Sequence, residues 1–453
     1  MKPRIKPKKL AVEERVKSFN EVVLGYTEEE AIKEAERCIQ CPTPPCVTGC
    51  PISIDIPSFI KALRERRFED SYKIMIATNP FPSICGRICP QEQQCEKVCT
   101  LGKIGEPVAI GKLEKFIGDL YLNKSNPEVT SPNGKKVAVV GSGPAGLACA
   151  YTLAKMGYSV SIFESLHKPG GVLTYGIPAF RLPKNIVEGY VNQLREMGVK
   201  IEVDVLVGRT IKFEYLLRNF DAVFLGTGAG LPRFLNIPGE NLNGIYSANE
   251  FLTRVNLMKA YLFPEYETPI YRAKHTVVIG GGNVAMDAAR VALRLGSEVT
   301  IAYRRSRKEM PARIEEIENA EEEGVKFVFL SSPIRFISRD NFWVSGVEFI
   351  RNRLGPKGPD GRRSFVPVEG SNYFMKTDCV VIAIGQLPNP LLPRLIPKLE
   401  CDERKGTIKV DEEGRTSIPK VYAGGDITTG AATAVEAIAA GVRVAYTIHK
   451  DLS

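Results

Sequence analysis

Two glycine-rich turns, each between an apolar strand and a helix, restrict the fold of this 453-residue chain more than any other feature. The turns occupy 141–146 and 280–285, so they stand about 140 residues apart. The elements predicted around them are strands at 136–140, 159–163, 275–279 and 298–303, and helices at 146–156 and 285–295. Strands that alternate with helices form parallel sheets covered by helices. The sequence therefore predicts an α/β chain with two Rossmann-like dinucleotide-binding folds in tandem.

The first turn, Gly-Ser-Gly-Pro-Ala-Gly, has the spacing that a dinucleotide pyrophosphate requires. Its first glycine permits the tight turn, its second lets the backbone approach the pyrophosphate, and its third allows close helix–strand packing. The N-terminus of the following helix adds partial positive charge. An acidic residue ends the next strand, where it can accept hydrogen bonds from a ribose. The predicted cofactor-binding residues here are Gly141, Ser142, Gly143, Ala145, Gly146 and Glu164.

The second turn has the same context but lacks the acidic residue. Where Glu164 would correspond, the strand runs into Tyr-Arg-Arg-Ser-Arg-Lys at 303–308. Guanidinium groups bind a phosphate through paired hydrogen bonds, so this site is predicted to prefer NADP(H) to NAD(H). A solvent-exposed basic turn is the alternative. The predicted binding residues are Gly280, Gly282, Asn283, Val284, Ala285, Arg304, Arg305 and Arg307.

A third glycine-containing segment lies near the C-terminus. Residues 421–426 are typical of a short strand that ends in Gly-Gly-Asp, and small residues and a helix follow. In flavoproteins with two dinucleotide folds, such an aspartate binds the ribityl chain and the helix N-terminus stabilises the reduced flavin. A turn with a helix cap is the alternative. We therefore predict FAD at the first turn and NADPH at the second, with further FAD contacts from Gly425, Asp426, Thr433 and Ala434.

Eight of the eleven cysteines fall within residues 38–99, in two sets of four. The first set is Cys38, Cys41, Cys46 and Cys50, and the second is Cys85, Cys89, Cys95 and Cys99. Closely spaced cysteines followed by one more before a proline resemble the bacterial ferredoxin arrangement, in which that last cysteine binds the other cluster. Structural zinc and disulfides are the alternatives. Two [4Fe–4S] clusters are favoured, because only the first set contains a C-x2-C pair and because we expect a reducing compartment.

Composition narrows the function further. The net charge of +9 is modest and no long basic run is present, so nucleic acid is not expected as a partner. No apolar stretch could span a membrane, and the N-terminus lacks the apolar segment of a signal peptide, so we expect a cytoplasmic protein without a membrane partner. With three histidines in the chain, a histidine-based metal site or catalytic triad is disfavoured.

The predicted domains follow from these segments. They are an α-helical iron–sulfur domain at 1–130, an FAD-binding domain in two parts at 135–256 and 387–453, and an NADP(H)-binding domain inserted between those parts at 257–386. NADPH releases two electrons together, whereas iron–sulfur clusters accept one at a time, and a flavin connects the two processes. The hydride passes between cofactors, so no catalytic side chain is predicted.

The order of these motifs, from Cys38 to about His449, resembles the small-subunit family of NADPH-dependent glutamate synthase. The large subunit of NADH-dependent ferredoxin:NADP oxidoreductase and the N-terminal half of dihydropyrimidine dehydrogenase are similar to the same family. The motifs that carry the resemblance are the cysteine sets, both glycine turns, 170–178, 181–184, 303–305 and the Gly-Gly-Asp at 424–426.

The resemblance implies roles that spacing alone does not provide. One cluster would be held by Cys38, Cys41, Cys46 and Cys99, and the other by Cys50, Cys89, Cys95 and the carboxylate of Glu114. Cys85 would then bind no iron, whereas without the resemblance Glu114 would be an ordinary helix carboxylate. The resemblance also implies that Gly171, Val172 and Arg181 contact FAD, and that Ala383 and Gly385 contact the nicotinamide cofactor.

The function implied by the resemblance is that of an enzyme subunit that moves electrons between NADP(H) and a partner. The partner would be the glutamate synthase large subunit, or a smaller flavoprotein with a [2Fe–2S] centre together with ferredoxin. In the second case the electrons could bifurcate along two paths. A non-catalytic, zinc-stabilised nucleotide-binding scaffold or sensor is the alternative from another functional class.

Overall fold

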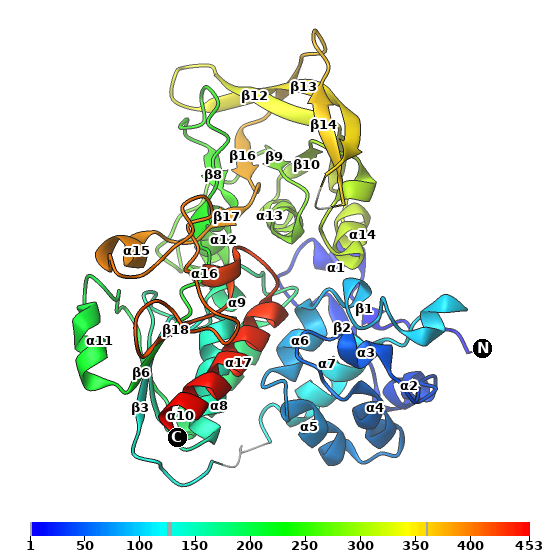
Figure 1. Cartoon of the computed structure of the whole chain (residues 1–453). Coiled ribbons are helices and arrows are strands. Elements are labelled where there is room, and N and C mark those ends of the chain that lie inside the picture. Colours follow the sequence, from blue (N-terminus) through cyan, green and yellow to red (C-terminus); the bar gives the residue numbers. More distant parts are fainter. Residues whose placement is uncertain (1, 125–128, 359–360) are drawn as a thin grey trace.

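The computed structural model describes residues 2–124, 129–358 and 361–453. The first segment forms a helical unit beside the two dinucleotide folds (Figure 1). Its helices are α1 (Val12–Arg15), α2 (Glu28–Ala35), α3 (Pro45–Thr48), α4 (Ile56–Arg64), α5 (Phe68–Ile76), α6 (Pro82–Ile88) and α7 (Ile110–Tyr121), joined by 3-10 turns at Gln91–Gln93 and Thr100–Lys103. Strands β1 (Lys8–Lys9) and β2 (Val23–Gly25) pair antiparallel. Across the described residues, no helix has the length and apolar character to cross a membrane.

A parallel five-stranded sheet carries the first glycine turn. Its order is β18-β6-β3-β4-β5, with β3 (Lys136–Val140), β4 (Ser159–Phe163), β5 (Lys200–Glu202), β6 (Ala222–Leu225) and β18 (Val421–Ala423). Its associated helices are α8 (Pro144–Lys155), α10 (Lys184–Glu196), α11 (Phe213–Asn219) and α17 (Ala434–Leu452). Strand β18 joins β6 only after the chain has completed the second fold. The predicted insertion of one dinucleotide fold into the other is therefore confirmed.

A second parallel sheet carries the other glycine turn. Its order is β11-β10-β9-β16-β8, with β8 (Ile245–Ser247), β9 (His275–Ile279), β10 (Glu298–Tyr303), β11 (Lys326–Phe329) and β16 (Cys379–Ile382). Helices α12 (Ala248–Leu252), α13 (Asn283–Arg294) and α14 (Ile314–Glu322) belong to this fold, and a π-turn spans Thr253–Leu257. Strand β8 pairs with β16 although it precedes the predicted boundary at residue 257. Its three residues carry no motif that would have assigned them to this sheet.

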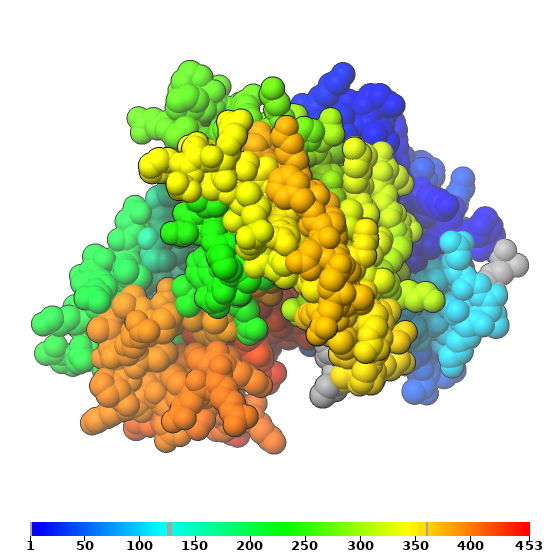
Figure 2. Space-filling view, turned by 90° about the horizontal axis from the view of Figure 1, so that it is seen from above, coloured from blue at the N-terminus to red at the C-terminus, as the bar shows by residue number. Residues whose placement is uncertain are grey.

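An antiparallel sheet that the sequence did not indicate lies between β11 and β16. Its strands are β12 (Ser331–Ser338), β13 (Val344–Lys357), β14 (Arg363–Pro367) and β15 (Tyr373–Lys376). Figure 2, seen from above, shows this sheet covering the second fold. The chain passes between the two folds twice, and a short antiparallel pair, β7 (Leu231–Pro232) with β17 (Gln386–Leu387), joins these two connecting segments. The remaining helices of the described residues are α9 (Val172–Tyr175), α15 (Leu391–Leu395) and α16 (Asp426–Thr429), with 3-10 turns at Ala260–Leu262 and Arg307–Glu309.

The C-terminal helix α17 packs directly on α8, the helix that starts at the first glycine turn. Gly441 makes this close approach possible, because a Cβ added there would lie 2.2 Å from the carbonyl oxygen of Ala145. Buried residues of both helices, including Leu147 and Ile438, share one hydrophobic core. The end of the chain thus holds the helix that is predicted to bind FAD.

Replacing Gly441 by alanine should destabilise the protein by about 1–3 kcal/mol, because overpacking forces one of the two helices to shift. The matched control is Gly102→Ala, where the nearest atom to the new Cβ would be 3.8 Å away, at Pro107. Thermal unfolding of both purified variants measures the difference. Equal melting temperatures for the two variants would contradict the close α8–α17 contact.

Candidate cofactor sites

The first glycine turn has the shape of a pyrophosphate cradle. Gly141 has a φ of +95°, and a Cβ added at Gly146 would lie 1.9 Å from the carbonyl oxygen of Gly141. Gly143 has no atom within 4 Å of an added Cβ, so its outer side is open. It is the N-cap of α8, and no side chain caps that helix. Free backbone N–H groups at a helix start favour an anion, so these residues fit a dinucleotide.

Glu164 is buried at the end of β4 and accepts hydrogen bonds from the glycine turn. Its Oε2 accepts hydrogen bonds from Ser142 N at 2.9 Å and from Ser142 Oγ at 2.5 Å. Its Oε1 accepts one from Leu166 N at 2.8 Å. Ser142 Oγ in turn accepts from Gly170 N at 3.0 Å. The predicted ribose-binding carboxylate therefore also ties the first turn to the 170–183 loop.

That loop lies directly against the glycine turn. A Cβ added at Gly171 would meet Gly143 Cα at 2.7 Å, and Val172 begins α9 at this point. The ammonium of Lys184 donates hydrogen bonds to the carbonyl oxygens of Leu173, at 2.9 Å, and of Ile177. Burial lowers the pKa of Lys184 to about 7. Lys184 thus ties α9 and the residues just after it to the start of α10.

The predicted FAD residues near the C-terminus lie at the start of α16 and α17. Gly425 has a φ of +79°, and a Cβ added there would lie 2.9 Å from the Cβ of Ala145. Burial raises the pKa of Asp426 to about 6, although a backbone hydrogen bond from Ala432 opposes the shift. Thr433 caps α17 in a capping box with Glu436. The fold thus brings Gly425 and Asp426 to the first glycine turn.

The second glycine turn repeats this geometry. A Cβ added at Gly280 would lie 2.3 Å from the carbonyl oxygen of Ala383, so the turn and the 383–385 segment are in contact. Gly282 is open on its outer side, with Pro311 Cγ at 3.9 Å as its nearest neighbour. Asn283 begins α13, and its Oδ1 accepts a hydrogen bond from Arg313 N at 2.9 Å. These residues, too, fit a dinucleotide.

The three arginines predicted to bind the 2′-phosphate do not share one environment. The guanidinium carbons of Arg304 and Arg305 lie over the ring of Phe365 on β14, at 4.7 Å and 5.6 Å from its centroid. Arg307 instead forms an ion pair with Glu321 on α14. The structure therefore brings two of the three predicted arginines together.

Four cysteines line one apolar pocket in the helical unit. They are Cys38, Cys41, Cys46 and Cys99, the four that the resemblance assigns to one cluster. The other lining residues are mostly aliphatic and include Ile56, Ile60, Leu101, Val108 and Ile110. Burial raises the pKa of the Cys46 thiol to about 12, and neighbouring Cys38 and Cys99 add to the shift. The last cysteine of the second set thus joins three members of the first.

The other cysteines gather around the buried side chain of Glu114 on α7. Burial raises the pKa of Cys95 well above its usual value, and Cys50, Glu114 and Cys89 are among the neighbours that add to this effect. Burial likewise raises the pKa of Glu114 to about 8, against the hydrogen bond that it accepts from Asn79. Within residues 2–124, 129–358 and 361–453, no three His, Cys, Asp or Glu side chains converge closely enough to hold a single metal ion.

Asn79 is a member of this group that sequence reasoning missed. Its Nδ2 donates to Glu114 Oε1 at 2.7 Å, and its Oδ1 accepts from Cys85 Sγ at 3.6 Å and from Phe81 N at 3.0 Å. The asparagine therefore orients the predicted carboxylate ligand and also engages the thiol that is predicted to bind no iron. A single Asn-Pro pair in a turn gave no signal for this role.

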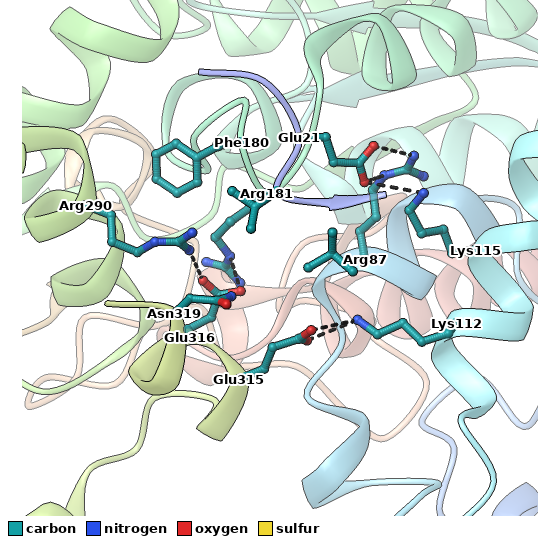
Figure 3. A pocket seen from close by; sticks show the side chains of 12 residues that line it. Glu21, Arg87, Lys112, Lys115, Phe180, Arg181, Arg290, Glu315, Glu316 and Asn319 are labelled. Carbon is teal, nitrogen blue, oxygen red and sulfur yellow. Dashed lines mark hydrogen bonds and ion pairs between the residues drawn. The ribbon is translucent and has the colours of Figure 1, made fainter. Parts of the chain in front are cut away.

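A group of buried charges joins the three parts of the chain at the start of α14 (Figure 3). Arg181, predicted to contact FAD, donates to both carboxylate oxygens of Asp287 on α13, at 2.9 Å and 2.7 Å. It also lies 3.2 Å from Glu316 on α14, which pairs with Arg290. The Arg181 side chain is only 6% exposed. It thus bridges the FAD-site loop and the second dinucleotide fold.

The helical unit reaches the same helix through a second set of contacts. Lys112 on α7 forms an ion pair with Glu315 at 3.0 Å. Arg313 donates to the carbonyl oxygen of Arg87 and to Gln91 Oε1, both at 3.0 Å. Burial alone would raise the pKa of Glu315, but Lys112 and Arg313 outweigh it and lower the pKa to about 2. The carboxylate is therefore charged at neutral pH and holds two units together.

Replacing Glu316 by glutamine should lower the free energy of unfolding by about 3–5 kcal/mol, because Arg181 and Arg290 would lose a buried counter-charge. The matched control is Glu318→Gln on the exposed side of the same helix, which should change it by less than about 0.5 kcal/mol. Chemical denaturation of the two purified variants gives both values. A loss at Glu316 no larger than at Glu318 would show that the buried pairs contribute no net stability.

Comparison with known proteins finds two families on this chain. One is described as dihydropyrimidine dehydrogenase domain II, 4Fe-4S cluster, and matches residues 15–126. The other is described as pyridine nucleotide-disulphide oxidoreductase and matches residues 135–441. The boundary between the matches coincides with the passage from the helical unit to the first parallel sheet.

Relatives match along most of the chain. The glutamate synthase [NADPH] small chain of Halomonas elongata is 37% identical, over 96% of this chain and 93% of its own length. The same subunit of Azospirillum brasilense is 38% identical, over 98% and 93%. The NADP(+)-dependent formate dehydrogenase subunit beta of Moorella thermoacetica is 39% identical over 90% of this chain, which spans only 60% of that relative. Among solved structures, Mycobacterium tuberculosis FprA shares the fold, with 24% identity over 70% of this chain and 84% of its own, at a TM-score of 0.59.

Proposed function

Because this chain belongs to the family of the NADPH-dependent glutamate synthase small chain, we propose that it carries electrons between NADP(H) and a partner subunit through FAD and two [4Fe–4S] clusters. The chain is an oxidoreductase with FAD, NADP(H) and iron–sulfur binding regions. We propose, in addition, the number of clusters, their ligands and the kind of partner.

The observation that carries the proposal is where the cysteines lie in the hydrophobic cores. Cys85 and Cys89 belong to the core that contains Ala145 and the other buried residues of α8. Cys95 belongs to the separate core of the helical unit, and Cys50 packs against both cores. The group around Glu114 therefore lies between the first dinucleotide fold and the pocket of the other four cysteines. This order supports a path from FAD through one cluster to the next.

The side chains support this role by holding and orienting the cofactors. Bound FAD would accept electrons in pairs from NADPH and release them singly to iron–sulfur clusters. The residues of the two glycine turns, with Gly425 and Asp426, would hold the dinucleotides. The thiolates and the Glu114 carboxylate would hold the irons, and Asn79 would keep that carboxylate oriented.

The partner that we propose is a second redox subunit, either the glutamate synthase large subunit or a smaller flavoprotein with a [2Fe–2S] centre and ferredoxin as a further partner. The names of the relatives support a partner in general, since they describe a subunit beta and a small chain. Cytoplasmic location is part of the same proposal, because free thiols persist in a reducing compartment. Identification of the chain that co-purifies with this one separates the two candidate partners.

Cys85→Ser should leave both clusters in place, because the proposed ligand set excludes this thiol. Cys89→Ser is the matched control and should remove one cluster, with loss of about half of the bound iron. Iron analysis and electron paramagnetic resonance of the reduced proteins measure both effects. If Cys85→Ser lost a cluster and Glu114→Ala left both spectra unchanged, Cys85 rather than Glu114 would be the ligand.

NADPH should bleach the flavin absorbance much faster than NADH does at equal subsaturating concentration, because arginines rather than an acidic residue follow β10. Stopped-flow absorbance of the purified protein at about 450 nm compares the rates of flavin reduction by the two cofactors. Equal rates would defeat the assignment of the second site to NADP(H). Colourless protein that contains zinc would instead favour the non-catalytic scaffold and overturn the electron-transfer proposal altogether.

A further inference from the structure

We propose that Phe365 of the antiparallel sheet positions Arg304 and Arg305 for the 2′-phosphate of NADP(H), so that this sheet determines which nicotinamide dinucleotide the chain prefers. The inference rests on the proposed function, since it concerns the nucleotide of the second glycine turn. The inference assigns a role in cofactor choice to a residue that lies outside the parallel sheet and outside every nucleotide-binding motif of the sequence.

The ring of Phe365 lies beside both guanidinium groups. Arg304 Cζ is 4.7 Å and Arg305 Cζ is 5.6 Å from the ring centroid, within the range in which a cation is attracted to an aromatic face. Arg305 Nε also donates a hydrogen bond of 2.6 Å to the carbonyl oxygen of Arg363, two residues before the phenylalanine. Strand β14 thus fixes one of these side chains at two points.

The same sheet also holds the main chain of the two arginines. Asn352 on β13 is buried, and its Nδ2 donates to the carbonyl oxygen of Arg304 at 3.0 Å. Leu330, just before β12, donates its N–H to the carbonyl oxygen of Arg305 at 3.1 Å. Strands β13 and β14 and the residue just before β12 therefore contact both the backbone and the side chains of this turn.

Electrostatics explains why such an arrangement favours NADP(H). Two guanidinium cations beside one ring concentrate positive charge, and a phosphate group with nearly two negative charges is attracted to both of them. NAD(H) offers only a hydroxyl at the same position of its ribose, so it gains no comparable stabilisation. The side chain of Phe365 has no group that could donate a hydrogen bond to the phosphate. Its effect is exerted through the arginines, which makes it a positioning residue.

A neighbouring aromatic residue provides a matched control. Phe374 stands on β15 of the same sheet, which pairs with β13, and it is 57% exposed. The cation–aromatic contacts of Arg304 and Arg305 involve Phe365 and not Phe374. Phe374→Leu therefore removes the same kind of side chain from the same sheet without removing these contacts.

The experiment compares Phe365→Leu, Phe365→Tyr and Phe374→Leu in the FAD-loaded protein. Phe365→Leu should raise KM for NADPH about three- to tenfold, with KM for NADH and kcat unchanged within about twofold. Phe365→Tyr keeps an aromatic face and should restore the wild-type KM, and Phe374→Leu should match the wild type. Calorimetric binding of 2′,5′-ADP should weaken in Phe365→Leu, whereas binding of 5′-AMP should not.

Each other outcome is decisive. An unchanged KM for NADPH in Phe365→Leu, or an equal rise for NADH, overturns the inference, as does a KM in Phe365→Tyr as high as in Phe365→Leu. If Phe365→Leu fails to fold, the tyrosine variant decides the matter. A lowered affinity of Phe365→Tyr for 2′,5′-ADP overturns the inference, and a wild-type affinity supports it. Wild-type protein without preference for NADPH would refute the proposed cofactor choice itself, whereas a preference that survives Phe365→Leu refutes only the inference.

Discussion

Charged side chains can leave water only where other charges and hydrogen bonds replace the solvent, and at the start of α14 this condition joins three parts of the chain. Arg181 comes from the loop beside the first glycine turn, Asp287 from α13 and Glu316 from α14. Lys112 connects the helical unit to this group through its ion pair with Glu315. Each charge is satisfied only when the others are in place, so the two dinucleotide folds have one well-paired arrangement. Apolar contacts alone would specify that arrangement less sharply.

Electron transfer requires such a fixed arrangement, because its rate falls steeply as cofactors move apart. On α6 and just after it, Cys85 and Cys89 are buried within the core of the first dinucleotide fold, and this burial would fix the position of a cluster proposed there. Of the proposed ligands of that cluster, Cys89 is a buried member of the core that contains α8, so its side chain is held by packing against the same core. The buried charges hold the second dinucleotide fold against the first. The shared core holds the helical unit against the same first fold.

The sequence predicted the features that have local causes. Both glycine turns, the parallel strands beside them and the insertion of one fold into the other follow from short motifs and from their order. Strand β8, the antiparallel sheet and the role of Asn79 could not be predicted, since they depend on pairings between residues far apart in the chain, such as Ile245 with Val380. Arg181 shows a second limit: the family resemblance implied a cofactor contact, but nothing indicated its partner Asp287, which lies 106 residues away.

The role inferred for Phe365 separates the binding of a nicotinamide dinucleotide from the choice between NAD(H) and NADP(H). The glycine turn at the end of β9 is predicted to bind the pyrophosphate, which NAD(H) and NADP(H) share. The residues that orient Arg304 and Arg305 stand on β13 and β14, more than 40 residues further along the chain. Because the sheet is inserted between β11 and β16, its loops and side chains can change while the parallel sheet keeps its register. Cofactor choice, on the inference drawn from Phe365, therefore belongs to the inserted sheet and cofactor binding to the fold into which it is inserted.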